Sequence, residues 1–555
     1  MKTKILSLTF ALALLMPAHA QNEHSFSVSK NLDIFNSIYR QLDLFYVDSL
    51  EADKIVRVGI DAMLNELDPY TSYYPEEDMQ DLKMMTTGKY GGVGSIIRQR
   101  KDSTGVIIFE PYPDMPAAEV GLQVGDLMLE IDGKSLKGQN TSEVSEQLRG
   151  EPGTTFVLKV QRPGEKKKRE FKITRRNIKK SALPYYGMYG NAGYIHLTEF
   201  IEDCSKDVRK AYINLKEQGA KTLILDLRDN HGGLLTEAVD IVNLFVPKGL
   251  TIVETRGKLL AASSKYVTNK EPLDLDVPIV VLVNKETASA AEIVAGALQD
   301  LDRAVIVGNS TFGKGLVQSP RDLPYNGSIK LTTAKYYIPS GRCVQAIDYK
   351  KEREAAELYR TTGKRINTKD SIAHKTFHTA GGREVTEGSG VKPDIDVAHD
   401  TLSNIVFYLS DDDVLVDWGT RYFQKHPSIP AVRDFALTDA DYEDFKDMVK
   451  ASGFKYDRIS VKRLEDLKKT MRFEGYYEEA KDLLESLEAK LAHNLDKEMD
   501  RKKTDILKIM SLEVVKRYYY QAGMAEEALK GDKDLEKAIE IVSDQSEYNK
   551  ILGKS

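Results

Sequence analysis

Cysteine and tryptophan are scarce in this 555-residue chain, which contains two cysteines and one tryptophan. Cys204 and Cys343 allow one disulfide at most, which excludes a disulfide framework and a four-thiolate zinc site and leaves open whether the two pair. The 18 prolines and 38 glycines are too few for a collagen-like or low-complexity chain. The net charge of −6 argues against a dedicated nucleic-acid binder. These absences favour a large globular protein with several domains.

The first twenty residues have the features of a secretory signal peptide. Lys2 and Lys4 form a basic start, residues 5–16 are an almost wholly apolar run, and residues 18–20 read Ala-His-Ala, a small-x-small cleavage pattern. No later stretch is apolar for long enough to cross a bilayer, so we expect no integral membrane span. We predict removal of residues 1–20 and export to the periplasm, where activity must run without ATP.

Four further regions differ in their periodicity and predict a multidomain α/β chain. Residues 21–86 have helical spacing, 87–176 are short β-branched runs broken by glycine and proline, 177–400 alternate strand and helix, and 401–555 are helical and charged. The alternation in the third region predicts helices packed on a sheet. We predict strands at 95–98, 106–109, 127–131, 156–161, 169–173, 222–227, 279–283 and 304–307, and helices at 142–148, 234–245 and 288–299.

Two smaller patterns complete this reading of the chain. Residues 324–327, Pro-Tyr-Asn-Gly between apolar runs, predict a hairpin turn. In the last region four leucines at helical spacing predict one apolar stripe that serves packing or dimer formation. They are Leu484, Leu487, Leu491 and Leu495.

A glycine-rich turn stands before the first expected strand of the second region. Its residues are Gly91, Gly92, Val93 and Gly94. Glycines at such a turn let successive backbone N–H groups point inward and bind an anion. With residues 116–122 and 125–133, this turn resembles a PDZ domain, which implies capture of a C-terminal carboxylate at the glycines and addition of the peptide beside the strand at 95–97. A phosphate-binding loop is the alternative, but no Gly-Lys-Ser/Thr follows these glycines at the spacing of such a loop.

Three polar segments in the third region are candidates for catalysis. In the first, paired glycines ending at Gly233 can direct backbone N–H groups at a ligand oxygen. In the second, Ser289 lies between an apolar run and an expected helix. It is either a nucleophile or an ordinary N-cap. In the third, Lys314 lies between two glycines, as a buried neutral base or as a surface lysine. The segments are residues 226–233, 284–292 and 311–318.

Together these segments resemble the C-terminal processing peptidases, also called tail-specific proteases. The resemblance runs over about residues 30–400 and includes residues 67–69 and 390–394. It implies a crotonase/Clp-like ββα peptidase core after the PDZ domain. One departure is Ala291, which stands where many members have a second serine and leaves no rival to Ser289 on its turn.

The resemblance also implies a role for individual residues. Ser289 attacks the peptide carbonyl, Lys314 is its general base, and Gln318 orients the lysine. We expect Lys314 to lie away from carboxylates. The backbone N–H groups of Gly233 and Ala290 form the oxyanion hole. A solvated lysine has a pKa near ~10.4, so this mechanism needs a site that disfavours its charged form.

Arg149 is a candidate regulatory residue at the end of the expected PDZ helix. In the resembling family this loop can face the peptidase core, which implies a polar contact that holds the site open; a surface arginine is the alternative. Whether the PDZ domain delivers substrate or gates the site is open. We expect protein or peptide substrates with free C-termini, no nucleic acid, no cofactor and no metal. The helical ends favour self-association.

Three other functions compete with this reading. A Ser-His-Asp protease would need His196 or His231 to pair with a Gly-x-Ser-x-Gly elbow, which the chain lacks. A crotonase-like acyl-CoA enzyme fits neither export nor a PDZ domain. A non-catalytic periplasmic peptide-binding adaptor or chaperone remains the main alternative, and hydrolysis of an unstructured peptide separates it from a peptidase.

Overall fold

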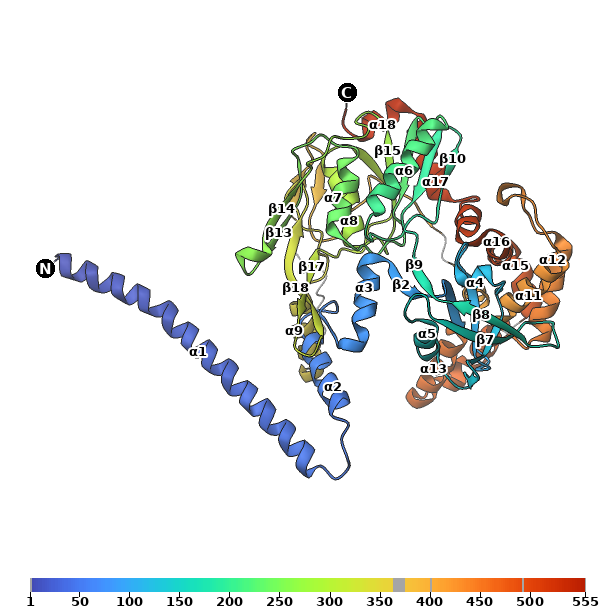
Figure 1. The fold of residues 1–555 in the computed structure, drawn as a ribbon, viewed down its shortest axis with the longest axis horizontal. Coiled ribbons are helices and arrows are strands. Elements are labelled where there is room, and N and C mark those ends of the chain that lie inside the picture. The colour runs from blue at the N-terminus through green and yellow to red at the C-terminus, as the bar shows by residue number, and fades with distance from the viewer. Residues whose placement is uncertain (1, 363–374, 400–401, 492–493, 555) are drawn as a thin grey trace. The chain divides into compact units, whose positions relative to one another are not determined.

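The computed structural model describes residues 2–362, 375–399, 402–491 and 494–554 (Figure 1). The chain divides into two compact units. The first comprises residues 1–74 and 320–332, and the second comprises residues 75–319 and 333–555.

The first unit contains helices α1 (Lys2–Phe45) and α2 (Ala52–Asn65) and the short strand β1 (Ser72–Tyr74). The Asp68 carboxylate accepts hydrogen bonds from the backbone of Tyr70 and Thr71, both at 2.8 Å, and these bonds form the turn that follows α2. The hairpin predicted at residues 324–327 is confirmed, because two left-handed residues there, as a primed turn requires, join strands β17 (Leu316–Asp322) and β18 (Ser328–Tyr337).

The PDZ-like part of the second unit is a β-rich module with its own apolar core. One sheet has the strand order β3-β4-β5-β7-β8, with β6 beside β5, so β3 is an end strand. The elements are η1 (Glu76–Asp78), α3 (Met79–Thr87), β2 (Lys89–Gly92), β3 (Ser95–Gln99), β4 (Val106–Pro111), α4 (Pro116–Glu119), β5 (Leu127–Ile131), β6 (Lys134–Ser135), α5 (Thr141–Leu148), β7 (Thr155–Gln161), β8 (Arg169–Thr174) and β9 (Arg176–Lys179).

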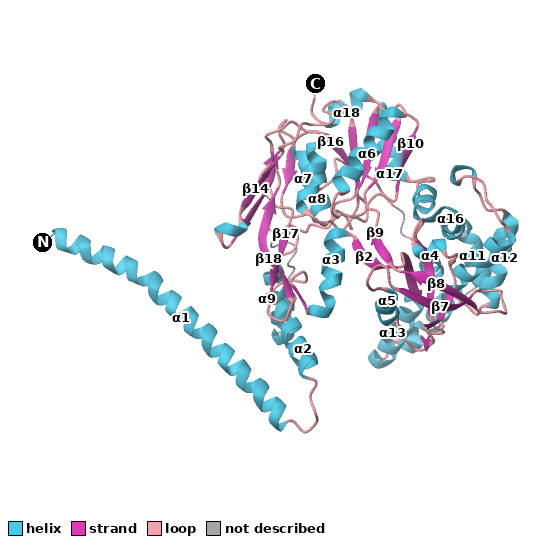
Figure 2. Ribbon diagram, viewed as in Figure 1, coloured by secondary structure: helices cyan, strands magenta, loops and turns pink. Residues whose placement is uncertain are grey.

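A six-stranded sheet forms the centre of the next part, in the order β10-β11-β12-β15-β16-β21, and all pairs except β10 with β11 are parallel. Figure 2 shows helices beside this sheet. The elements are β10 (Tyr185–Tyr189), β11 (Ala192–His196), α6 (Cys204–Glu217), β12 (Thr222–Asp226), α7 (Leu235–Asn243), β13 (Thr251–Gly257), η2 (Leu260–Ala262), β14 (Ser264–Val267), β15 (Ile279–Val283), α8 (Ala290–Asp300), β16 (Ala304–Gly308), α9 (Tyr349–Thr362), β19 (Thr376–His378), β20 (Glu384–Thr386) and β21 (Ile395–Asp396).

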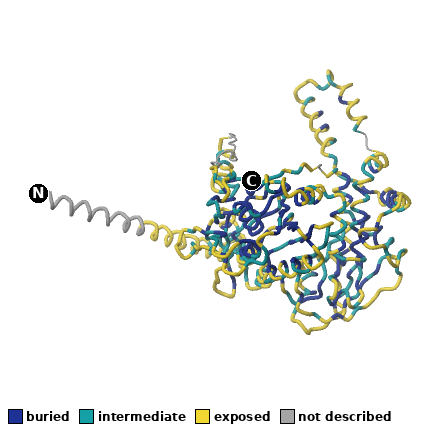
Figure 3. The backbone as a smooth tube through the Cα atoms, turned by 90° about the horizontal axis from the view of Figure 1, so that it is seen from above, coloured by how far each residue is buried: buried dark blue, intermediate teal, exposed yellow. Residues whose placement is uncertain are grey.

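Both faces of this sheet are buried, which explains the continuous apolar runs of β12 and β15 (Figure 3). Leu223 and Leu225 point into the cluster that contains α6, α7 and α8. Ile224 between them points into a second cluster made with the helices α17 (Lys533–Ser543) and α18 (Gln545–Ile551). The last helices of the chain therefore complete the core of the α/β sheet.

Six of the remaining elements contribute to a separate apolar cluster around Trp418. They are α10 (Asn404–Ser410), α11 (Asp413–Lys425), η4 (Val432–Asp434), α12 (Asp439–Ala451), α15 (Leu495–Arg501) and α16 (Lys503–Ala528). Helices α13 (Ile459–Glu474) and α14 (Tyr477–Lys490) follow α12 in the chain and lie outside that cluster.

The predicted leucine stripe is wrong as a single helical face. Helix α14 ends at Lys490, Leu491 is its C-cap, and Leu495 begins the separate helix α15. Leu484 is buried, whereas Leu487 is 44% exposed. The regular spacing of the leucines continues across the break between the two helices. Spacing of i, i+3 and i+4 does not show where one helix ends and the next begins. Both cysteines are buried free thiols.

Candidate active site

The three polar segments predicted from the sequence follow the carboxyl ends of β12, β15 and β16, which are parallel neighbours in the central sheet. Loops at that edge of a parallel sheet lie side by side. The Ala288 N–H donates to the Asn230 carbonyl at 2.9 Å, and the Phe312 N–H donates to the Thr287 carbonyl at 3.0 Å. These two bonds hold all three segments together.

Ser289 occupies a strained turn directly before α8. Its backbone has φ 56° and ψ −116°, a conformation that costs a residue with a side chain roughly 1–3 kcal/mol. The side chain is half-buried at the N-terminus of an eleven-residue helix, where the helix dipole favours negative charge. The Tyr336 hydroxyl donates to the Ser289 carbonyl at 3.1 Å and stabilises the turn.

The fully buried carboxylate of Glu292 ties the serine turn to the lysine segment. One oxygen accepts from the Ser289 N–H at 2.9 Å and from the Lys314 N–H at 2.8 Å. The other accepts from the Thr311 hydroxyl at 2.5 Å and from the Gly313 N–H at 2.8 Å. Because two backbone nitrogens share one oxygen, they lie no further apart than two hydrogen-bond lengths. Burial raises the pKa of Glu292, and the donated bonds oppose that rise.

The glycines of the first segment approach the serine turn directly. Gly232 has φ +95°, and a Cβ there would lie 2.8 Å from the Ser289 Cβ and 2.9 Å from the Ala290 nitrogen. Gly233 has φ +141° and is exposed. Asn230 positions the segment, since its side chain accepts from the Gly232 N–H at 2.9 Å and donates to the Leu197 carbonyl at 2.8 Å. Ala290 is the buried first residue of α8.

Lys314 is half-buried, and Gln318 lies four residues on in β17. The flanking glycines are needed for close packing: a Cβ on Gly313 would lie 2.3 Å from the Ala346 Cβ, and one on Gly315 would lie 2.8 Å from the Gln345 nitrogen. The Glu292 carboxylate accepts the backbone N–H of Lys314, and the expectation that the Lys314 ammonium lies away from carboxylates stays a prediction. The sequence could not show that this carboxylate turns inward.

An ion-pair network lies directly before the glycine segment. Burial opposes charge on Asp226, but the Arg228 guanidinium outweighs burial and holds the pKa of Asp226 below its ordinary value. Arg228 also bonds Asp532 at 2.7 Å and Asp534 at 3.0 Å, at the N-terminal end of α17. The helix that covers the second face of the sheet is thus tied to the candidate site.

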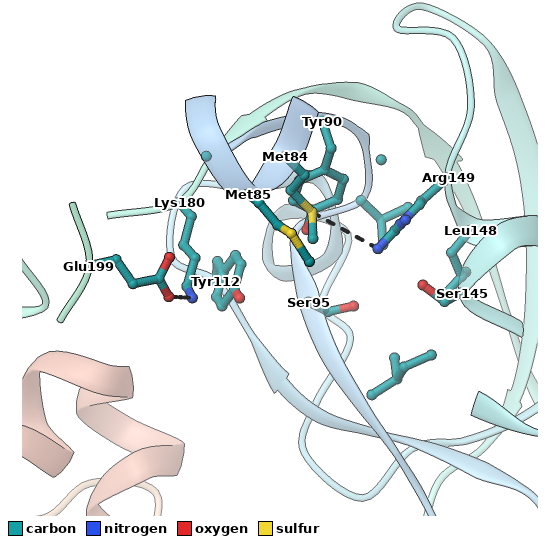
Figure 4. Close-up of a pocket in the computed structure, with 14 residues that line it drawn as sticks. Met84, Met85, Tyr90, Ser95, Tyr112, Ser145, Leu148, Arg149, Lys180 and Glu199 are labelled. Atoms are coloured by element: carbon teal, nitrogen blue, oxygen red, sulfur yellow. Dashed lines mark hydrogen bonds and ion pairs between the residues drawn. The ribbon is translucent and has the colours of Figure 1, made fainter. Parts of the chain in front are cut away.

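A cavity of about 360 Å³ lies between β3 and α5 and includes Gly92 and Val93 (Figure 4). We call it the tail pocket. Its apolar walls come from Ile97, Leu148 and two methionines of α3, Met84 and Met85. The pocket lies where the resemblance to a PDZ domain implies peptide binding.

The predicted anion-binding turn is only partly formed in the described backbone. Gly91 and Gly92 lie in β2, which pairs with β9, and Gly94 alone of the four residues has a left-handed backbone, with φ +72°. Val93 is buried, and its carbonyl accepts the Ala117 N–H.

Arg149 lies at the tail pocket rather than at the three polar segments. Its guanidinium pairs with Asp81, bonds the Met84 sulfur at 3.9 Å and lies over the Tyr90 ring at 5.8 Å. The contact expected with the peptidase core is therefore replaced by a contact with α3. Asp81 and Met84 belong to residues 21–86, before the region from which a PDZ domain was expected, and the sequence carried no signal for this pairing.

Within the described ranges no group of three or more His, Cys, Asp or Glu side chains is placed to hold a metal ion. None of the helices in the described part of the chain is long and apolar enough to cross a membrane.

Comparison with protein families assigns three parts of the chain. Residues 191–352 match "Peptidase family S41", residues 107–162 match "PDZ domain", and residues 405–542 match "Probable PDZ-protease, C-terminal helical domain". The chain is therefore a serine-type peptidase that carries a PDZ domain and a helical C-terminal domain.

Individual relatives define the family more closely. The chain is 37% identical over 369 residues to the "Carboxy-terminal-processing protease" of Bartonella bacilliformis, across 65% of this chain and 83% of the relative. It is 34% identical over 317 residues to a "Probable CtpA-like serine protease" of Staphylococcus aureus, across 57% of this chain and 62% of that protein. The chain belongs to the carboxy-terminal-processing protease family, as the sequence motifs predicted.

Solved structures include similar chains. The photosystem II D1 C-terminal processing protease aligns with 25% identity and a TM-score of 0.34, over 66% of this chain and 93% of that one.

Sequence reasoning missed three residues of the candidate site. Glu292 was recognised as part of its motif but given no role, although Ser-x-x-Glu at a helix start is the spacing of a capping box. Asn230 and Tyr336 carried no comparable signal. Their contacts depend on which segments the fold brings together.

Proposed function

We propose that this chain is an ATP-independent serine endopeptidase of the exported compartment that binds C-terminal tails through its PDZ domain and cleaves proteins near their C-termini. Ser289 is the nucleophile and Lys314 is the general base. The observation that carries the proposal is the buried Glu292 carboxylate, which accepts N–H bonds from both residues and so holds the two turns together.

The proposed reaction has two stages. The Ser289 hydroxyl attacks the scissile carbonyl while the neutral Lys314 amine takes its proton. The lysine then gives that proton to the leaving amine. In the second stage the lysine takes a proton from a water molecule, which attacks the acyl-enzyme, and returns it to the Ser289 oxygen. Gln318 orients the lysine.

The backbone N–H groups of Gly233 and Ala290 stabilise the tetrahedral oxyanion in this proposal. Three observations support that role. Gly233 is exposed, Ala290 begins α8, and Gly232 packs against the turn between Ser289 and Ala290. N–H groups at a helix N-terminus are suited to an oxyanion because they need no rearrangement as charge develops.

Tail recognition is assigned to the tail pocket. Among the described strands β3 ends its sheet, which leaves one edge for strand addition, and the pocket beside it is lined with flexible apolar side chains. This combination suits a free carboxyl terminus that ends in an apolar residue.

Export and self-association complete the proposal. Residues 1–20 have the pattern of a signal peptide, which supports a periplasmic location. Described side chains on α1, among them Phe26, Leu32 and Phe35, are 57–71% exposed, and such an apolar face favours association between copies of the chain.

The Lys314→Arg variant tests the catalytic assignment. Arginine keeps the positive charge but does not release a proton near neutral pH, so hydrolysis of an unstructured peptide should fall to background while peptide binding persists. The control is Lys285→Arg, an exposed lysine on the serine-bearing loop, which should keep full activity. A wild-type rate in Lys314→Arg would overturn the base assignment. An inactive wild-type chain that still binds tails would instead favour a non-catalytic adaptor.

A further inference from the structure

The tail pocket has a cation at each of two ends, Arg149 and Lys180 (Figure 4). Arg149 pairs with Asp81 of α3, whereas Lys180 pairs with Glu199. Lys180 follows β9 and lies outside the residues matched to a PDZ domain, and Glu199 belongs to the peptidase part of the chain. The Lys180–Glu199 ion pair thus joins the pocket to the peptidase core.

The pocket also contains a buried polar atom, the Ser95 hydroxyl oxygen, whose hydrogen-bonding capacity is unused. This oxygen bonds no other described residue. Ser95 and Lys180 line the same cavity as Met84 and Met85. A ligand that satisfies these groups needs an acceptor for the lysine and serine and an apolar part for the methionines. The last residue of a polypeptide, with a free α-carboxylate and an apolar side chain, has this chemistry.

We propose that Lys180 binds the α-carboxylate of the substrate tail, and that Glu199 holds Lys180 while the pocket is empty. The proposal rests on the tail recognition proposed above and names the residue that reads the carboxylate. The exchange is inexpensive because both side chains are partly exposed, at 41% for Lys180 and 37% for Glu199. Water therefore solvates the released Glu199 carboxylate, and the flexible lysine stem moves the ammonium to its new partner.

The position of Glu199 connects this exchange with the candidate active site. The next residue, Phe200, donates its N–H to the Gly232 carbonyl at 3.0 Å, and the Phe200 carbonyl accepts the Leu234 N–H at 2.7 Å. These bonds hold the segment that supplies the proposed oxyanion glycine. Tail capture at Lys180 therefore occurs one residue away from a backbone that positions Gly233.

The test compares two peptides of the same sequence, one with a free C-terminal carboxylate and one with a C-terminal amide. Binding is measured by fluorescence anisotropy on the full chain carrying Ser289→Ala, so that nothing is cleaved. Adding Lys180→Met should weaken free-acid binding about tenfold and leave amide binding unchanged, because one charge-assisted bond is lost. Adding Glu199→Gln should strengthen free-acid binding severalfold, because it removes the competitor for Lys180.

The opposite signs separate recognition from structure, since both variants break the same ion pair. A purely structural role predicts that both weaken both peptides, and that result would overturn the proposal. Lys179→Met and Glu202→Gln are the matched controls. Lys179 pairs with Asp207, Glu202 pairs with Lys89, and neither Lys179 nor Glu202 lines the pocket, so neither variant should change free-acid binding.

Two further outcomes separate this proposal from the function on which it rests. If the parent chain prefers the free acid and Lys180→Met keeps that preference, Lys180 is not the carboxylate contact and tail recognition stands. If the parent chain binds acid and amide equally, tail recognition fails and the role of Lys180 fails with it. Hydrolysis by the wild-type chain is scored separately, so neither result bears on Ser289.

Discussion

Replacing Gly232 with alanine tests the geometry of the candidate site at one atom. The added Cβ would lie 2.8 Å from the Ala288 carbonyl oxygen, 2.8 Å from the Ser289 Cβ and 2.9 Å from the Ala290 nitrogen. None of these atoms is the far end of a flexible side chain, so the serine turn itself must shift. Gly219, in the same unit, is the matched control: its φ is +97° against +95° at Gly232, but nothing lies within 4 Å of its Cβ position.

Both variants lose stability because a side chain is placed at a positive φ, but only one of them also displaces the serine turn. An alanine at such a positive φ costs roughly 1–3 kcal/mol of stability at either position. Only Gly232→Ala also displaces Ser289 and Ala290. A misplacement of about 1 Å at a reacting group lowers the rate by roughly 100-fold. We therefore expect similar losses of unfolding free energy in the two variants and a loss of about 100-fold or more in kcat for Gly232→Ala alone.

Urea unfolding and peptide hydrolysis under identical conditions supply the two measurements. Gly219→Ala should keep a rate close to that of the wild type once the folded fraction is taken into account. The reasoning is refuted if Gly232→Ala folds and cleaves at the wild-type rate. It is also refuted if both variants lose activity equally, since the effect would then follow stability rather than the serine turn.

Three other predictions follow from single contacts. Glu292→Gln should lower kcat by about 100-fold or more, because an amide NH₂ replaces an oxygen that accepts two hydrogen bonds; unchanged kcat would contradict the anchoring role. Burial, partly offset by Lys516, raises the pKa of Glu110 from 4.5 to about 7. The fold favours the neutral form of Glu110, so this group stabilises the folded state fully below pH 4.5, and the stabilisation is lost as the pH rises through 7. Urea unfolding across this range should show that the wild-type chain loses about 3 kcal/mol of unfolding free energy relative to Glu110→Gln. Parallel pH profiles for the two chains would contradict this. Arg149→Ala removes the contact with Asp81 and should lower hydrolysis without lowering the melting temperature, because the pair is partly exposed; unchanged kinetics on short and long substrates would show that the contact has no functional role.

Elements whose signal is local could be predicted closely. The strands at residues 127–131 and 279–283 are found with the predicted bounds, because an apolar run between polar turns defines a buried strand on its own. The helix expected from residue 288 begins at Ala290, since the φ of 56° at Ser289 lies outside the right-handed α-helical region. The order and chemistry of the polar segments were sufficient to predict the family.

Features that depend on distant contacts could not be predicted. Helices α17 and α18 cover the second face of the central sheet, more than 200 residues beyond most of its strands, and their charged sequence gave no sign of this. Gly91 and Gly92 suggested a left-handed turn, but pairing with β9 draws them into a strand. The inward direction of the Glu292 carboxylate likewise follows from the position of the lysine segment and not from its own sequence.

The most direct test of the catalytic assignment is peptide hydrolysis by purified Ser289→Ala, followed by mass spectrometry of the products. Ser264→Ala, an exposed serine on β14, is the matched control. The account predicts that Ser289→Ala folds, binds the free-acid tail and produces no fragment above background, while Ser264→Ala cleaves at the wild-type rate and at the same bonds. Wild-type fragments from a pure Ser289→Ala preparation would contradict the assignment of Ser289 as the nucleophile.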